Sequence, residues 1–123
     1  MRLTRRALLF AAGIAVGAGT ALGHHSLSAQ FDLMQSITLK GTVTRVDWSN
    51  PHVRLYLDTN GSGHSDVMHW ELEMSSPNQL LLQGIRIDNL RRGDWITVTA
   101  HPALNGSNLG YAQTISRPRS LSQ

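Results

Sequence analysis

Alternation of apolar and polar side chains is the feature that most constrains the fold of this chain. Two segments, residues 52–59 and 66–75, alternate with a period of two, which predicts strands with one buried face. The loop between them is rich in Gly, Asn and Ser, so the two strands should form a hairpin. The side chains expected to face the core are Val53, Leu55, Leu57, Met68, Trp70, Leu72 and Met74.

Three further segments are predicted strands: residues 37–48, 95–101 and 111–115. Gly41 should mark a bulge or a sharp bend in the first of them, because the apolar side chains change parity along that strand. A strand of this kind can curve around a small barrel, so the pattern favours a closed sheet over a flat one.

A short helix is predicted between the third and fourth strands. Ser76 can cap it, Pro77 suits its first position and Gly84 follows its end. Its leucines should close one end of the barrel. The element order is that of the oligonucleotide/oligosaccharide-binding (OB) fold, an all-β, five-stranded barrel with one short helix. Residues 24–123 suffice for one such domain, and the fold by itself defines no function.

Residues 1–23 have the layout of an export signal. Arg2, Arg5 and Arg6 precede an uncharged run rich in Gly and Ala, which is shorter than the roughly 20 residues that a membrane span needs. We therefore expect a periplasmic or secreted mature protein without a membrane span. Residues 4–9 resemble the twin-arginine pattern, which leaves the general and the twin-arginine export routes both open.

Removal of residues 1–23 would leave a formally neutral chain, because its three arginines account for the net charge of +3. That balance disfavours nucleic acid as a partner. The sequence has no Cys, so a metal would need nitrogen or oxygen ligands. It also lacks a nucleophile-elbow, phosphate-loop or HExxH motif, which favours a binding protein over an enzyme.

His24 and His25 would begin the mature chain if cleavage follows Gly23. The freed amine of His24 and its imidazole can chelate one ion, and nitrogen chelates favour Cu(II). This arrangement resembles the histidine brace of some exported copper proteins. Cleavage after Ala21 would instead place His24 third, in another terminal copper-binding pattern. The alternative is that both histidines lie in a solvated terminus.

His52 is the next candidate ligand, because Asn50 and Pro51 fix a turn before it and its parity is outward. A hairpin register with His52 opposite Glu73 and Arg54 opposite Glu71 would make Glu73 a metal ligand or a hydrogen-bond acceptor that orients the ring. His101, on an outward position before Pro102, is the reserve ligand. Alternatively, Asn50 and His52 only satisfy backbone groups of the turn.

Several motifs resemble a family of small exported bacterial proteins of unknown function. They are His24-His25-Ser26, Trp48-Ser49-Asn50-Pro51-His52, Trp70-Glu71-Leu72-Glu73 and Ser76-Pro77-Asn78. The resemblance implies no activity. Three functions follow from the residues: a copper-binding protein, a metal-free module that holds another exported protein, and a copper-dependent oxidase.

Overall fold

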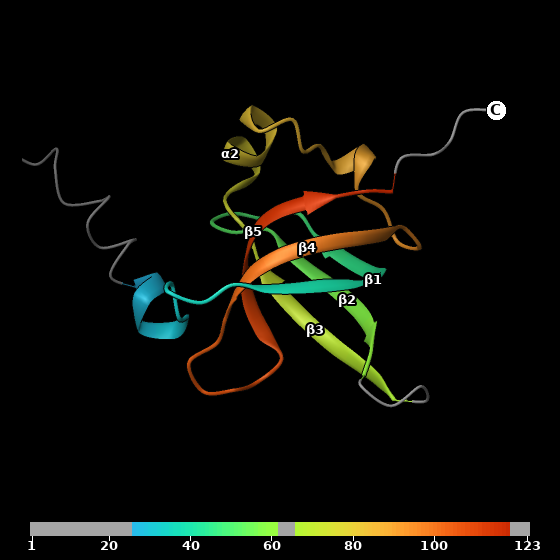
Figure 1. Ribbon diagram of the computed structural model, residues 1–123. Helices are drawn as coiled ribbons and strands as arrows, with labels where there is room; N and C mark the ends of the chain where they lie inside the picture. The colour runs from blue at the N-terminus through green and yellow to red at the C-terminus, as the bar shows by residue number, and fades with distance from the viewer. Residues whose placement is uncertain (1–25, 62–65, 119–123) are drawn as a thin grey trace, which may run out of the picture.

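The described part of the chain forms a closed barrel in this computed structural model, which describes residues 26–61 and 66–118. Its strands are β1 (Ile37–Asp47), β2 (Arg54–Asn60), β3 (Val67–Glu73), β4 (Trp95–Pro102) and β5 (Leu109–Ser116). They follow one another around the barrel in the order β1-β2-β3-β5-β4 (Figure 1). The predicted all-β, OB-like barrel is therefore confirmed. Within the described residues, no helix is long and apolar enough to cross a bilayer.

Strand β1 holds the two halves of the barrel together, because it pairs with β4 through residues 37–42 and with β2 through residues 41–47. Gly41 lies where both pairings overlap, and a Cβ there would stand 2.1 Å from the carbonyl oxygen of Asp58. The predicted bulge at Gly41 is misplaced. The register shift lies between Val43 and Arg45, so the extra residue, not the glycine, changes the buried parity.

The hairpin of β2 and β3 keeps the predicted faces but not the predicted register. Arg54 lies opposite Glu73, and Tyr56 lies opposite Glu71, two residues from the expected pairing. The cause is the loop, which closes one residue later than predicted through the hydrogen bond from the Gly61 amide to the Asp66 carbonyl. A shift of two residues leaves every side chain on its expected face.

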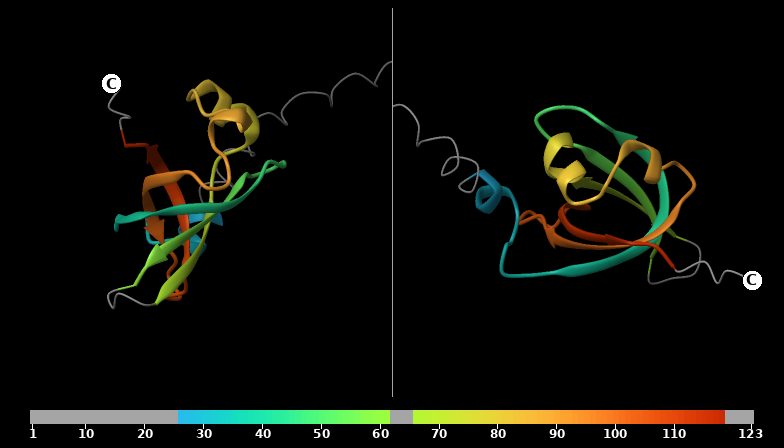
Figure 2. Two further views of the ribbon diagram at one scale, coloured as in Figure 1. Left: turned by 90° about the vertical axis from the view of Figure 1, so that its right-hand side faces the viewer. Right: turned by 90° about the horizontal axis from the view of Figure 1, so that it is seen from above.

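The predicted helix is confirmed as α2 (Pro77–Leu82), with the Ser76 hydroxyl accepting a hydrogen bond from the Gln79 amide. With the 3₁₀ helix η1 (Ile87–Asn89), it lies across one end of the barrel (Figure 2). The prediction that its leucine cluster closes that end holds for Leu80 but not for its neighbours. Only Leu80 is buried, while Leu82 is 88% exposed, because a single turn and a half of helix presents one face to the core.

The core is formed by inward side chains of the strands, joined by Leu80 and Leu90 from the segment that closes the end. Met68 and Trp70, which alternation predicted to face the core, are only partly buried. The most buried members all occupy inward positions predicted from the sequence. They are Val43, Val53, Leu55, Leu57, Leu72, Ile96 and Val98. The outer face of the strands thus remains available for polar and titratable side chains.

Candidate functional site

The side chains of His52 and Glu73 contact each other on the outer face, through His52 Nδ1 and Glu73 Oε1. The turn before β2 positions His52, and its Asn50–Pro51 peptide bond is cis. An ionised carboxylate only accepts hydrogen bonds, so Nδ1 must carry the proton and the Nε2 of a neutral ring keeps its lone pair. Metal-binding histidines are typically oriented in this way by a carboxylate.

A row of side chains crosses the outer face from this pair. Glu73 lies opposite Arg54 on one side and Tyr111 on the other, and Tyr111 lies opposite His101. Directly opposed residues project from the same face of a sheet. The Tyr111 hydroxyl is 3.1 Å from the Ser75 hydroxyl, which ties the row to the segment that leaves β3.

The segment before β1 packs on this row. The Phe31 ring is 6.0 Å from the Tyr111 ring between centroids, and Phe31 is 5% exposed. Backbone hydrogen bonds from the Asp32 amide to the Pro102 carbonyl and from the Leu104 amide to the Gln30 carbonyl, each 2.9 Å, attach the segment to the end of β4. Residues 26–30 are helical and lie at the end of the barrel where β4 ends (Figure 1).

His101 has a partner of its own. Its Nδ1 is 2.7 Å from the Gln35 carbonyl oxygen, which can only accept, so Nδ1 donates and Nε2 remains an acceptor. Two strand spacings separate His101 from Glu73, about 10 Å between backbones, with Tyr111 between them. The structure therefore does not bring the reserve ligand together with the His52–Glu73 pair.

His69 resembles His52 in chemistry but not in position. Its Nδ1 is 2.6 Å from Asp58 Oδ1, on the outer face of the same hairpin. It lies toward the loop that joins β2 to β3, on the far side of the Arg54–Glu71 pair, which has an N–O distance of 3.6 Å. Residues 26–36 contact β4, β5 and the loop between them, so His69 is a suitable control for His52.

The predicted ligand set is described only in part. His24 and His25 lie outside residues 26–61 and 66–118. Among the described residues, no three His, Asp or Glu side chains gather closely enough to hold a metal ion. The predicted contact between His52 and Glu73 is present in the structure. In the observed register the two residues are diagonal neighbours, because Glu73 lies directly opposite Arg54.

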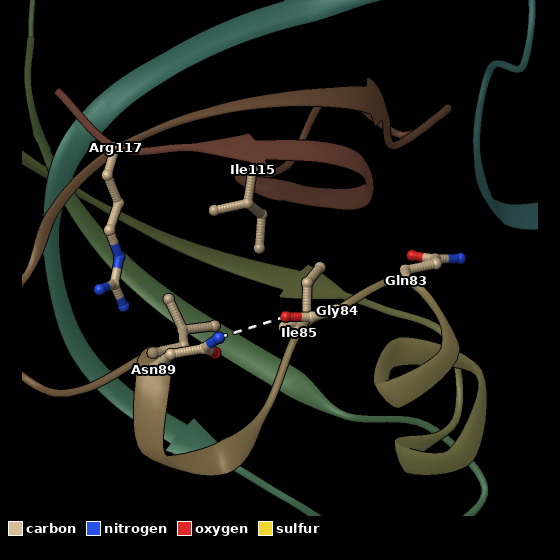
Figure 3. Close-up of a pocket in the computed structure, with 7 residues that line it drawn as sticks. Gln83, Gly84, Ile85, Asn89, Ile115 and Arg117 are labelled. Atoms are coloured by element: carbon tan, nitrogen blue, oxygen red, sulfur yellow. Dashed lines mark hydrogen bonds between the residues drawn. The ribbon is translucent and has the colours of Figure 1, made fainter. Parts of the chain in front are cut away.

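A groove runs between β5 and the segment from α2 to η1. One of its cavities, of about 390 Å³, is lined by Gln83, Gly84, Ile85, Asn89, Leu90, Ile115 and Arg117. A second cavity, of about 210 Å³, shares Gln83, Ile85 and Ile115 with it, so the two are adjacent. Figure 3 shows Ile115 pointing from β5 toward the residues of this segment.

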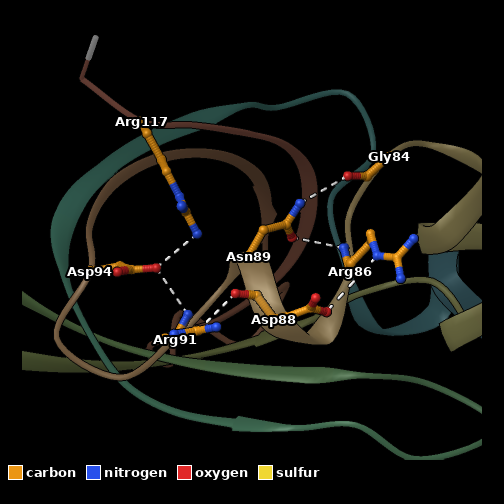
Figure 4. A network of polar contacts seen from close by, with 7 residues as sticks. All are labelled: Gly84, Arg86, Asp88, Asn89, Arg91, Asp94 and Arg117. Carbon is orange, nitrogen blue, oxygen red and sulfur yellow. Dashed lines mark hydrogen bonds and ion pairs between the residues drawn. The ribbon is translucent and has the colours of Figure 1, made fainter. Parts of the chain in front are cut away.

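Charged side chains surround one end of this groove (Figure 4). Asp94 accepts hydrogen bonds from the Arg91 amide at 2.9 Å and from the Arg117 guanidinium at 2.8 Å. The backbone hydrogen bond and then the guanidinium hold the pKa of Asp94 below its ordinary value of 3.8. Arg91 Nε donates to the Asp88 carbonyl, which fixes a second guanidinium beside η1.

Sequence reasoning missed Tyr111 and Arg117 as members of these two regions. Both belong to β5 or follow it directly, and β5 pairs with β3 in parallel. A parallel pairing joins strands far apart in the chain, and no turn between them reveals its register. The alternation pattern predicted the strand at 111–115 but could not say which side chains it would meet.

Comparisons with known proteins identify a family and a fold. The model of a family of unknown function, DUF6152, matches residues 12–113. Two crystal structures of the mitochondrial single-stranded DNA binding protein Rim1 from S. cerevisiae are similar to this chain at 10% identity. The first has a TM-score of 0.52, and the match covers 67% of this chain and 91% of Rim1. The second has a TM-score of 0.51, and the match covers 72% of this chain and 98% of Rim1. No curated protein matches the sequence. At this identity the likeness concerns the fold alone.

Proposed function

The chain belongs to the DUF6152 family, whose function is unknown, and we propose that it is an exported periplasmic protein that binds copper through its mature N-terminus. Export is inferred from residues 1–23, where three arginines precede an uncharged run that ends in small residues. Cleavage after Gly23 would free the amine of His24, which with its imidazole forms a nitrogen chelate.

The oriented ring of His52 is the observation that carries this proposal. Glu73 holds its Nδ1, the side chain of His52 is 44% exposed, and Nε2 is the atom left to bind a metal. Glu73, with its side chain 23% exposed, acts as the acceptor that fixes the ring and supplies a negative charge near the ion. His25 is the further nitrogen ligand in this proposal.

Docking of the N-terminal segment supports the same site. Phe31 packs on Tyr111, and Tyr111 lies opposite Glu73 on the outer face. His24 precedes Phe31 by seven residues. Because residues 26–30 are helical, with a rise of about 1.5 Å per residue, the stretch from His24 to Phe31 spans roughly 15 Å. The proposal expects the amine of His24 and the ring of His52 to meet within this reach. The chain would hold the ion through nitrogen and carboxylate groups, because it has no Cys.

A competition titration with a chromophoric copper chelator tests this function. The exported protein with a verified N-terminus is compared with its His24→Ala, His52→Ala and Glu73→Ala variants. We expect His24→Ala to abolish tight binding, and the other two to weaken it by roughly 10- to 100-fold, as loss of ligands or of their orienting partners does.

His69→Ala is the matched control, because it removes an imidazole with the same kind of carboxylate partner from the same hairpin. Its copper affinity should equal that of the unaltered protein. Equal affinity in all four variants would contradict the proposal and favour a metal-free module that binds another exported protein. Circular dichroism of each variant checks that the barrel is retained.

A further inference from the structure

Strand β5 has a free edge beside the groove. On one side it pairs with β4 along residues 110–116, but on the other it pairs with β3 only through residues 109–111. Beyond Tyr111, β3 has ended and the chain continues toward α2, so within the described residues no strand covers this side of residues 112–116. Unpaired backbone groups of this kind are a template for an added strand.

The groove next to this edge has a mixed lining, in which Ile85 and Ile115 form the floor and the polar side chains of Gln83 and Asn89 lie beside them. Leu80 and Leu90 are 2% and 3% exposed, and Ile85 and Ile115 pack against the same core while remaining partly exposed. An extended chain in the groove could therefore form backbone hydrogen bonds to β5 and place alternate side chains on this floor. The side chains of alternate residues would point outward to solvent.

The charges around the groove indicate which kind of peptide would bind in it. Among the described residues that line the groove, Arg117 is the one cation, and none is a carboxylate. Around its end, Arg86 and Arg91 add positive charge, while Asp88 and Asp94 are already engaged with Arg86 and Arg117 at 3.9 and 2.8 Å (Figure 4). Three arginines against two aspartates leave this end positive, which complements an acidic partner.

We propose that this groove binds an extended, acidic peptide segment of another protein by strand addition to residues 112–116 of β5. The site borders the outer-face row at Tyr111, which lines the second cavity, but it differs in chemistry, since its described lining contains no His and it presents a strand edge. Arg117 contacts a carboxylate of the bound segment, and Asp94 holds the guanidinium in place for that contact.

The test uses the mature protein labelled with nitrogen-15 and an acetylated peptide in which valine alternates with glutamate. The proposal expects amide shifts at residues 112–116 and 83–90, and slower hydrogen exchange at the free edge of β5. The same peptide with lysine in place of glutamate should bind more weakly. Arg117→Gln should weaken binding of the glutamate peptide by roughly tenfold, as loss of one charge-assisted contact does.

Arg45→Gln is the matched control, because Arg45 is exposed on β1 and contacts Tyr56 and Asp47 away from the groove. It should leave peptide binding unchanged. Equal affinity for both peptides, or shifts confined to β2 and β3, would overturn the proposal. Two other results would also overturn the acidic peptide as the ligand of this edge. One is self-association of the protein in sedimentation experiments with protection of the same edge from hydrogen exchange, and the other is stronger binding of a short oligothymidylate at that edge.

Discussion

At the scale of single residues, Gly41 has the least tolerance for change. A Cβ at this position would stand 2.1 Å from the Asp58 carbonyl, a backbone atom that is fixed by the pairing of β1 and β2. Gly41→Ala should lower the free energy of unfolding by about 3 kcal/mol, measured by chemical denaturation. Gly61→Ala is the comparison, because its nearest atom would lie at 3.1 Å. An equal loss in both variants would contradict the close approach at Gly41.

Asp94 gives a pH-dependent prediction. Its pKa in the folded protein lies below the ordinary value of 3.8, because the Arg91 amide and the Arg117 guanidinium favour the ionised form. The stabilisation is therefore complete above the unfolded pKa and is lost as the pH falls through the lower folded pKa. Asp94→Asn should cost about 1 kcal/mol at neutral pH, and its difference from the unaltered protein should shrink in acid.

Urea denaturation at a series of pH values measures this difference. Asp66→Asn is the control, since Asp66 is an exposed carboxylate on the hairpin. Its difference from the unaltered protein should be small throughout. An Asp94→Asn difference that stays constant down to strongly acidic pH would mean that the charge of Asp94 does not stabilise the fold.

Part of the candidate site could be predicted at this scale. Alternation correctly placed His52 and Glu73 on one face. Their contact was predicted although the predicted register was wrong by two residues, because long side chains of diagonal neighbours on a sheet can still meet. The contact of Phe31 with Tyr111 could not be predicted. It joins an irregular segment to a strand that lies far along the chain, and no local sequence pattern shows that two such distant residues will meet.

At the scale of elements, α2 depends on one leucine. Leu80 is 2% exposed and packs in the core, whereas Leu82 is 88% exposed on the same helix. Leu80→Ala should lower the free energy of unfolding by about 2–5 kcal/mol, while Leu82→Ala should change it by less than about 0.5 kcal/mol. Thermal or urea unfolding of the two variants gives the comparison. Similar losses in both would contradict the observed orientation of α2.

Strands were easier to predict than their connections. Strands β2 and β4 show the expected alternation, whereas Met68 and Trp70 of β3 are only partly buried. Ser76, Pro77 and Gly84 gave the helix its bounds. The bulge in β1 was placed at Gly41 instead of between Val43 and Arg45, because a glycine needed for close packing and a bulge look alike in one sequence. Bulges depend on the partner strand, and that partner is fixed only when the barrel closes.

At the scale of the whole molecule, the two proposed sites adjoin at Tyr111, but His52 contacts Glu73 whereas Arg117 contacts Asp94. The His52–Glu73 pair belongs to the outer face of β2 and β3, and the groove lies between β5 and η1. We therefore expect additive behaviour. His52→Ala should leave peptide-induced shifts unchanged, and Arg117→Gln should leave copper affinity unchanged. A change of more than about threefold in either crossed measurement would show that the sites are coupled.

Copper binding by the mature N-terminus is the central claim, and native mass spectrometry of the exported protein tests it most directly. The full precursor is expressed, the exported form is purified with copper supplied, and its N-terminus and bound metal are determined together. The account predicts a chain that begins at His24 and carries one copper ion, which a His24→Ala precursor does not retain. A mature protein that begins elsewhere and takes up no copper would contradict it.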